Sequence, residues 1–311
     1  MGSTKPDISV IILTHNEQAH IARAIASVQA IAEAIFIVDS GSDDNTLAIA
    51  RSMGVHVVSH PFTTQARQLN WALDTLPIRS HWILRLDADE IIEDDLAQAI
   101  IETLPALGED ITGVEFARKH IFMGRWIRHG GRYPLWMLRL FRKGYGRSED
   151  RWMDEHIALT KGQTMRLQGG FADINLGDLS HFTTKHNGYA TREAISILIN
   201  RYALVANAIP TDEPLAIAGS AVTRRWCKRH IYDRLPFGCG PMAYFLYRFI
   251  VRAGFLDGVE GVIYHGLQGF WYRFLVDAKV LYWDRALRKL PDREARLARL
   301  EELTGYRLQE I

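Results

Sequence analysis

Short apolar runs alternate with amphipathic stretches over the first hundred residues. Four runs rich in Ile and Val predict buried strands, at residues 8–13, 34–39, 55–60 and 81–87. Apolar residues between the runs recur at helical spacing, which predicts helices with one buried face. These helices carry Ile21, Ile25 and Val28, then Ile49, then Leu69, Leu73 and Leu76, and the last spans residues 94–104. Strands separated by such helices predict an α/β fold with a mostly parallel sheet flanked by helices.

The pattern changes twice in the rest of the chain. Residues 113–127 and 137–143 are interpreted as strands or a loop excursion. From Gly188 onward the spacing is helical, which predicts a helical C-terminal region. Its predicted helices cover residues 189–208, 240–255, 262–283 and 292–306. We therefore expect one domain at residues 1–187 and a helical region at residues 188–311.

Composition restricts the class of protein. The chain has 311 residues, 48% of them hydrophobic and 23% charged, with a net charge of only +1, so nothing in the totals indicates nucleic acid as a partner. Two cysteines fit a reducing compartment. The first residues lack the apolar core of a signal peptide, and the charge-free run 235–247 is shorter than the roughly 20 residues of a membrane span. We expect a cytoplasmic protein that does not cross a membrane.

Positive charge is concentrated in one segment. Residues 221–252 contain seven Lys or Arg side chains and one acid, Asp233. Beside the apolar stripe of residues 242–250, this excess favours an amphipathic helix that lies on an anionic membrane surface. The alternative is that the stripe belongs to the core of the domain.

Polar segments follow three of the predicted strands: "THNE" at 14–17, "DSGSDDNT" at 39–46 and "DADE" at 87–90. Any one of them could be a turn or a helix cap. Together they predict a ligand site, because ligands of open α/β sheets bind beyond the carboxyl ends of the strands. Asp87 and Asp89 would share a face of a strand, and like charges that close repel unless a cation lies between them. Mg²⁺ or Mn²⁺ would suit these oxygen ligands.

Several nucleotide and metal sites are excluded by their signatures. Asp39 ends the second strand where a ribose-binding acid would lie, but the turn after the first strand lacks G-x-G-x-x-G. A P-loop and the ligand spacing of an EF-hand are also absent. What fits is a nucleotide held at its base or ribose by Asp39. Its diphosphate would be bridged to Asp87 and Asp89 through a divalent cation.

The motifs "SVIILTHNE", "IFIVDSGSDDNT", "ARQLNWAL" and "WILRLDADE" together resemble a family 2 glycosyltransferase with the GT-A fold. They lie within residues 8–90. The later segments "GRWIRHGGRYPLWMLRLFRK", "WMDEHI", "LSHFTTKHNGYATREA" and "GFLDGVEG" are similar to one branch of that family, the bacterial lipopolysaccharide core β-glucosyltransferases and exopolysaccharide enzymes. The resemblance assigns nucleotide-sugar binding to residues 8–110 and the acceptor and catalytic part to residues 111–187.

The resemblance also implies roles for single residues. Glu155 is the expected general base, with Asp154 as the alternative. Asp87 and Asp89 are expected at the metal, joined by His181, for which a structural role at a strand end is the alternative. The residues expected to bind the nucleotide sugar are Thr14, Asn16, Glu17, Asp39, Ser42, Asp43, Arg67, Asn70, Asp87 and Ala88. Arg128, Arg132, Tyr133 and Trp136 are expected to bind the acceptor, because arginines bind anionic groups and aromatic rings stack on sugars.

The implied activity is an inverting, metal-dependent transfer of a hexose, with glucose expected, from a UDP-sugar. The acceptor would be a lipopolysaccharide core or a lipid-linked saccharide, met at the cytoplasmic face of the inner membrane, and the new bond a β-linkage. Two alternatives remain open. One is a nucleotidyltransferase acting on sugar phosphates, although "THNEQAH" lacks the glycine-rich signature that it needs. The other is a non-catalytic glycan- or lipid-binding protein on a degenerate transferase fold.

Overall fold

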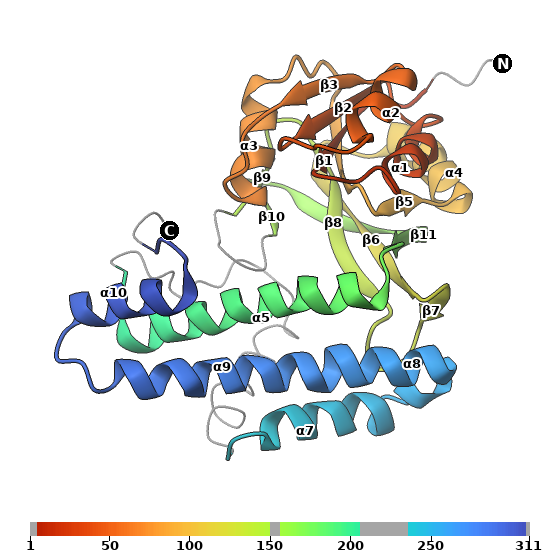
Figure 1. Ribbon diagram of the computed structural model, residues 1–311. Helices are drawn as coiled ribbons and strands as arrows, with labels where there is room; N and C mark the ends of the chain where they lie inside the picture. The colour runs from red at the N-terminus through yellow and green to blue at the C-terminus, as the bar shows by residue number, and fades with distance from the viewer. Residues whose placement is uncertain (1–4, 150–155, 206–235, 309–311) are drawn as a thin grey trace. The chain divides into compact units, whose positions relative to one another are not determined.

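The computed structural model describes residues 5–149, 156–205 and 236–308, shown in Figure 1. The chain divides into two compact units, Met1–Leu176 and Gly177–Ile311. The boundary expected at residues 187/188 falls inside a long helix, α5 (Leu179–Tyr202), which belongs wholly to the second unit.

The first unit is built on a mixed sheet. Among the described residues, nine strands follow the order β3-β2-β1-β4-β8-β6-β11-β5, with β7 paired to β6. The pairs from β3 to β4 are parallel, and β8 joins β4 and β6 antiparallel to both. The strands are β1 (Ile8–Thr14), β2 (Ala34–Asp39), β3 (His56–Ser59), β4 (Trp82–Asp87), β5 (Glu90–Ile92), β6 (Ile111–Phe122), β7 (Arg125–Ile127), β8 (Leu135–Arg142) and β11 (Gln163–Ile174). A separate antiparallel pair is formed by β9 (Gly146–Ser148) and β10 (Ile157–Leu159).

Helices cover both faces of this sheet, as Figure 1 shows. The buried side chains of α1 (Ile21–Val28), α2 (Thr46–Ser52) and α4 (Asp94–Thr103) share one core with the strands, and those of α3 (Gln65–Thr75) lie in a second core. All seven residues of β1 are buried, as expected for a central strand covered on both sides. The predicted α/β architecture with a helical C-terminal region is therefore confirmed.

In the described residues of the second unit, all the regular elements are helices. Its elements are α5, α7 (Cys239–Leu246), η3 (Tyr247–Val251), η4 (Gly254–Asp257), α8 (Gly258–Tyr264), η5 (His265–Trp271), α9 (Tyr272–Leu287) and α10 (Arg293–Thr304). The long helix α5 begins nine residues before the predicted Gly188, because the Asp178 side chain caps it by accepting a hydrogen bond from the backbone N–H of His181 at 2.7 Å. None of the helices in the described ranges has the length and apolar character needed to cross a bilayer.

Candidate active site

The carboxyl ends of β1, β2 and β4 meet at one edge of the sheet. The register pairs Thr14 with Asp39 and Leu13 with Asp87, so the last residues of the three strands are neighbours. The three polar segments that follow these strands therefore start from a common edge, where an open α/β sheet binds its ligands.

Asp39 is buried at this edge. Its Oδ1 accepts hydrogen bonds from the hydroxyls of Thr14 and Ser42, and its Oδ2 accepts from the backbone N–H groups of Gly41 and Ser42. Burial by itself raises the pKa of Asp39, but these hydrogen bonds outweigh it and hold the pKa below its usual value. A carboxylate offers about four lone-pair positions. Asp39 thus shapes the loop that follows β2, and a nucleotide base or ribose would donate to Asp39 only in place of one of these donors.

Asn16 and Glu17 tie the turn after β1 to the same loop. The backbone of Asn16 is left-handed, with φ 56°, a conformation that asparagine adopts more readily than most residues. Its N–H donates to Ser42 Oγ at 2.8 Å, and its Oδ1 accepts from the N–H of Asp43 at 2.9 Å. The N–H of Glu17 donates to Thr46 Oγ1 at 2.8 Å. The structure thus brings together the predicted donor-binding residues Thr14, Asn16, Glu17, Asp39, Ser42 and Asp43.

Asp87 is held by two arginine side chains. Arg85 Nη2 lies 3.3 Å from Asp87 Oδ1, and Arg139 Nη2 lies 3.0 Å from Asp87 Oδ2. Burial by itself raises the pKa of Asp87, but the charges of Arg85, Arg139 and Arg118 outweigh it and hold the pKa well below its usual range. The cations that neutralise Asp87 in this structure are therefore guanidinium groups.

Glu90 shares Arg139 with Asp87. Arg139 Nη2 donates to Glu90 Oε1, and Glu90 Oε2 accepts from the backbone N–H of Asp87 at 2.9 Å. The side chains of Arg139 and Glu90 are only 3% and 2% exposed. Burial raises the pKa of Glu90 to about 7; the charge of Arg139 opposes this rise and the charge of Asp87 adds to it. Arg139 therefore fixes both the Asp87 carboxylate and the turn that leads from β4 into β5.

Replacing Arg139 by methionine should destabilise the fold. Two carboxylates would lose the guanidinium that they share, and breaking a buried ion pair in this way costs about 3–5 kcal/mol. The matched control is Arg166→Met, which removes an exposed arginine 3.0 Å from Glu115 and should cost less than about 1 kcal/mol. Urea unfolding measures both free energies. If Arg139→Met lowered the free energy of unfolding no more than the control does, the buried ion pairs of Arg139 would not stabilise the fold.

Asp89 lies at the same edge and is partly exposed. Its Oδ2 accepts from Asn175 Nδ2 at 3.3 Å, and its carbonyl oxygen accepts from the N–H of Ile174 at 2.9 Å. Ala88, between the two aspartates, is buried. Across residues 5–149, 156–205 and 236–308, no three His, Cys, Asp or Glu side chains are grouped closely enough to hold a metal ion. A cation at Asp89 would therefore need further ligands from a bound nucleotide or from other parts of the chain.

A row of ionisable side chains crosses three strands beside this edge. The ladder pairs Glu90 with Asp173 of β11, and Asp173 with His120 of β6, so the three share one face of the sheet. His120 Nδ1 lies 3.1 Å from Asp173 Oδ2, and Arg118 Nη1 lies 3.6 Å from it. Burial by itself raises the pKa of Asp173, but the His120 hydrogen bond and the charges of His120 and Arg118 lower it to about 2. Sequence reasoning missed this row, although "FARKH" places Arg118 and His120 at the strand period of two.

Two of the predicted acceptor-binding residues gather around one indole ring. Tyr133 meets Trp126 edge-on, with 4.9 Å between ring centroids. The Arg128 guanidinium lies 5.2 Å from the centroid of the same indole. This group combines aromatic surface with an exposed positive charge.

The other two predicted acceptor-binding residues have different surroundings. Trp136 lies under the guanidinium of Arg166, 5.0 Å from it. The charge of Arg132 helps to lower the pKa of Asp173, so Arg132 belongs to the charged row. Through contacts between described residues, the four therefore do not form one group.

Asn70 joins helix α3 to strand β9. Its Nδ2 donates to the Ser148 carbonyl oxygen at 2.9 Å, and its Oδ1 accepts from the Ser148 N–H at 3.0 Å. On the same helix, Gln68 Nε2 donates to Ser40 Oγ at 2.8 Å. Helix α3 therefore connects the loop after β2 to β9, with Arg67 exposed beside these contacts.

Glu155 and Asp154 lie outside the described residues, so their roles stay predictions. The described residues on either side of that segment are held together, because the N–H of Glu149 donates to the carbonyl oxygen of His156 at 2.9 Å. His181 is exposed in the first turn of α5, in the second unit, and not at a strand end. Its assignment to the metal also stays a prediction.

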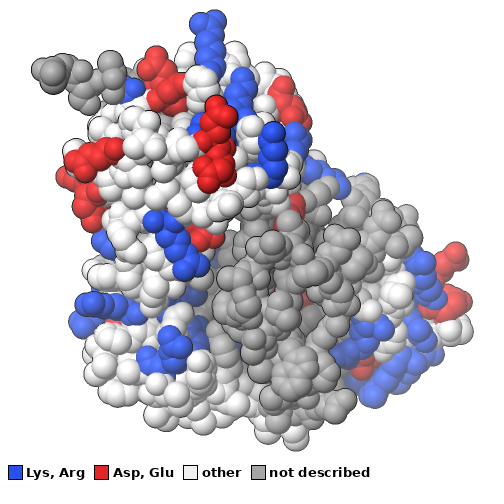
Figure 2. Space-filling model, turned by 180° about the vertical axis from the view of Figure 1, so that it is seen from behind, with Lys and Arg blue, Asp and Glu red and all other residues white. Residues whose placement is uncertain are grey.

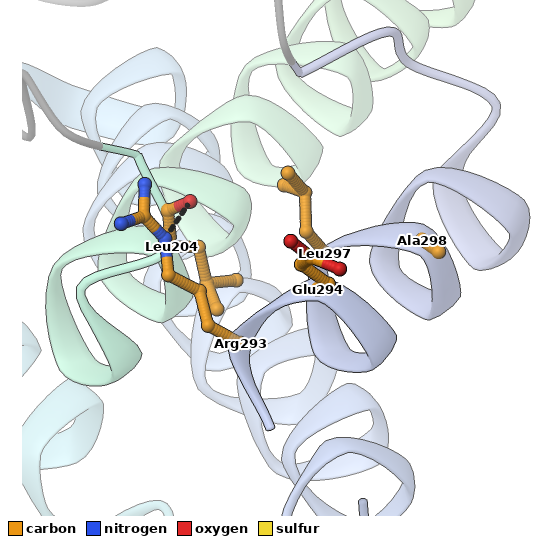
Figure 3. A pocket seen from close by; sticks show the side chains of 5 residues that line it. All are labelled: Leu204, Arg293, Glu294, Leu297 and Ala298. Atoms are coloured by element: carbon orange, nitrogen blue, oxygen red, sulfur yellow. Dashed lines mark hydrogen bonds between the residues drawn. The ribbon is translucent and has the colours of Figure 1, made fainter. Parts of the chain in front are cut away.

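A cavity of about 560 Å³ opens in the second unit beside α10 (Figure 3). Its lining among the described residues is Leu204, Arg293, Glu294, Leu297 and Ala298. Arg293 Nε donates to the Leu204 carbonyl oxygen at 2.9 Å, so part of the polar lining is already bonded within the unit. These lining residues include none of the predicted site residues, and the candidate active site is therefore the sheet edge of the first unit.

Proteins similar to this chain in sequence include the following two. A glycosyltransferase of Rickettsia bellii (strain RML369-C) is 43% identical over 93 residues, which is 30% of this chain and 31% of that protein. The chain thus matches about a third of the length of this relative. The lipopolysaccharide core biosynthesis glycosyltransferase LpsC of Rhizobium meliloti (strain 1021) is 27% identical over 301 residues, which is 93% of this chain and 96% of LpsC.

A solved structure was also matched. Glucosyl-3-phosphoglycerate synthase from Mycobacterium tuberculosis, in complex with Mn²⁺, uridine diphosphate and glucosyl-3-phosphoglycerate, gives a TM-score of 0.41 at 18% identity. The match covers 62% of this chain and 79% of that one.

The family model for glycosyl transferase family 2 matches residues 9–165, half of the chain. That range contains the ends of β1, β2 and β4, with Asp39, Asp87 and Asp89. The chain therefore belongs to glycosyl transferase family 2.

Proposed function

We propose that this glycosyltransferase moves a hexose, with glucose the expected sugar, from a UDP-sugar to a lipopolysaccharide core or lipid-linked saccharide. The observation that carries the proposal is the common sheet edge that holds Asp39, Asp87 and Asp89 inside the family 2 domain. The similarity to LpsC over 93% of this chain supports the choice of acceptor class.

The donor pocket is proposed to lie along this edge. Thr14, Asn16, Asp39 and Ser42 form its hydrogen-bonded floor, where the nucleoside would bind. The diphosphate would lie near the end of β4. Because Arg85 and Arg139 already neutralise Asp87, the pocket presents little unbalanced negative charge to a diphosphate at that point.

The residues present fit a divalent cation that is bound jointly with the donor. Mg²⁺ and Mn²⁺ accept one or two carboxylates together with substrate phosphates. Asp89 is a partly exposed carboxylate at the sheet edge where the donor is proposed to bind. Asp89 would be the main protein ligand, with Asp87 beside it and His181 as a third candidate. When bound, such an ion neutralises charge on the departing diphosphate as a Lewis acid.

The transfer is proposed to invert the anomeric configuration. Glu155 would take the proton of the acceptor hydroxyl, with Asp154 as the alternative base, while that oxygen attacks the anomeric carbon from the face opposite the diphosphate. The bond from the anomeric carbon to the diphosphate oxygen breaks as the new glycosidic bond forms. An α-linked donor therefore yields a β-linked product, and no covalent enzyme intermediate is needed.

The acceptor is proposed to bind through Arg128, Arg132, Tyr133 and Trp136. The Trp126–Tyr133–Arg128 group supplies aromatic surface for a sugar ring and a charge for an anionic substituent. A glycolipid acceptor of this kind would be met at the cytoplasmic face of the inner membrane.

The test is a calorimetric panel of nucleotide sugars, each measured with Mn²⁺ and with EDTA. We expect UDP-hexoses to bind more tightly than other nucleotide sugars, UDP-glucose most tightly, and binding to weaken at least about tenfold in EDTA. A preference for another nucleotide would overturn the donor assignment. Equal affinity in EDTA would overturn the metal assignment.

A further inference from the structure

A helical hairpin in the second unit carries an exposed apolar surface. This apolar hairpin comprises residues 237–262, that is α7, η3, η4 and most of α8. Ten of the sixteen exposed large hydrophobic side chains in the described residues belong to it. Figure 2 shows few charged side chains along the lower left edge of the view. Monomeric proteins rarely expose a contiguous apolar patch unless it binds something.

The exposed side chains lie on both arms of the hairpin and on its turn. Met242, Leu246 and Ile250 follow one another at intervals of four along the first arm. Val251 is 71% exposed at the end of that arm, and Leu256 is 53% exposed in the turn. The second arm contributes Val259, which is 69% exposed. An apolar tip of this kind is suited to enter the acyl-chain region of a lipid bilayer.

The exposed surface is distinct from the face that holds the hairpin together. Phe245 and Phe249 are stacked at 5.2 Å on the inner side, and Phe245 contacts Phe270 at 6.1 Å. At the turn, a Cβ on Gly261 would lie 2.9 Å from the carbonyl oxygen of Gly254, so the two glycines allow the backbone to close tightly. Of the outward apolar residues, Phe255 also packs inside the hairpin, with its ring centroid 6.1 Å from that of Phe249.

Charge indicates which partner covers this surface. The hairpin itself carries two arginines and two acids, so the positive excess lies in the segment before it. Arg248 is buried and donates to Gln268, Arg252 is exposed beside the tip, Asp257 is buried and Glu260 is partly exposed. In the sequence, residues 224–234 immediately before the hairpin contain five Lys or Arg and one acid. An anionic lipid surface attracts such a segment. A second copy of this chain would instead bring a second segment of the same sign.

We infer that the apolar hairpin inserts to the boundary between the headgroups and the acyl chains of an anionic bilayer, and that apolar contact supplies most of the affinity. The basic segment before it adds attraction without anchoring the protein alone. The inference rests on the proposed function only in that a glycolipid acceptor would be met at such a surface. The turn and the exposed side of the hairpin are the parts that contact the membrane, as in monotopic proteins, which lie on the membrane and do not span it.

The test is sedimentation of the full chain with vesicles of phosphatidylcholine containing phosphatidylglycerol, at low salt and at about 1 M salt, where the Debye length is about 3 Å. Wild type should bind in both, more weakly in high salt. The double variant Val251→Asp/Leu256→Asp should bind at least about tenfold less, because two apolar contacts become charges. The control Tyr282→Asp changes a side chain that is 69% exposed on α9, outside the hairpin, and should bind as wild type does.

Three results would overturn the inference: no vesicle binding by wild type, equal binding by the double variant, or complete loss of binding at high salt. A dimer whose dissociation follows Val251→Asp/Leu256→Asp would show that a second copy covers the surface. Thermal unfolding of each variant verifies that it is folded. Calorimetry with UDP-glucose is a separate measurement, so a failed proposal about the donor and a failed proposal about the membrane remain distinguishable.

Discussion

Replacing Asp89 by alanine should reduce metal-stimulated transfer from a UDP-sugar by at least about 10²-fold, because a Lewis-acid contact supplies several kcal/mol and about 1.4 kcal/mol corresponds to a factor of ten. Asp89 is the partly exposed carboxylate in the turn between β4 and β5, and the nearby Asp87 is held by Arg85 and Arg139. The loss should appear in turnover measured at saturating Mn²⁺.

The controls for this prediction come from the same segment. Asp94→Ala removes an exposed carboxylate in the first turn of α4 and should leave turnover within about twofold of wild type. Asp87→Asn should lower the free energy of unfolding as well as activity, because Arg85 and Arg139 lose the carboxylate that they share, and it should lower that free energy more than Asp89→Ala does. Full activity of the wild-type enzyme in EDTA would contradict the metal assignment.

The first half of the fold could be predicted because its signals are local. The runs that become β1, β2 and β4 are continuous and β-branched, and their predicted limits agree with the structure to within a residue. Strand β11 has no such signal. Its alternation is interrupted by Gly169 and Gly170, and it is recognised only through its parallel pairing with β6, about fifty residues earlier in the chain.

The candidate site shows the same division between local and long-range information. The polar segments after β1, β2 and β4 could be placed at one edge from topology alone. Of the two cations at Asp87, Arg85 lies two residues earlier on the same strand. Arg139 could not be identified, because it arrives from β8 through an antiparallel pairing that the spacing of residues 87–90 does not encode. His120 and Asp173 were missed for the same reason.

The apolar stripe of the second unit could be found from the sequence, but not the direction in which it points. Periodicity puts Met242, Phe245, Leu246, Phe249 and Ile250 on one side of a helix. In the structure Phe245 and Phe249 lie against other aromatic rings, whereas Met242, Leu246 and Ile250 are exposed. One side of a stripe this wide is buried and the other is exposed. Which side is buried depends on the elements that pack against the helix, and the sequence pattern does not give these.

Helix α3 links the two halves of the proposed reaction. Through Gln68 it contacts the loop after β2, where the nucleoside is proposed to bind, and through Asn70 it holds both backbone groups of Ser148 at the end of β9. The segment with Glu155 lies between β9 and β10 in the sequence, and these two strands pair with each other. The attachment points of the proposed base are therefore fixed to the same helix as the donor loop.

Glu155→Gln should therefore lose about 10²–10⁴-fold in turnover, the usual contribution of a general base, while its affinity for UDP stays that of wild type. Glutamine keeps the size of the side chain but cannot take the proton of the acceptor hydroxyl. The measurement pairs turnover at saturating donor with calorimetric UDP binding, and Asp154→Asn is the matched control one residue away. Weakened UDP binding by Glu155→Gln would place this residue in the donor site. A large loss of turnover in Asp154→Asn alone would make Asp154 the base, because only one of the two adjacent carboxylates can accept that proton.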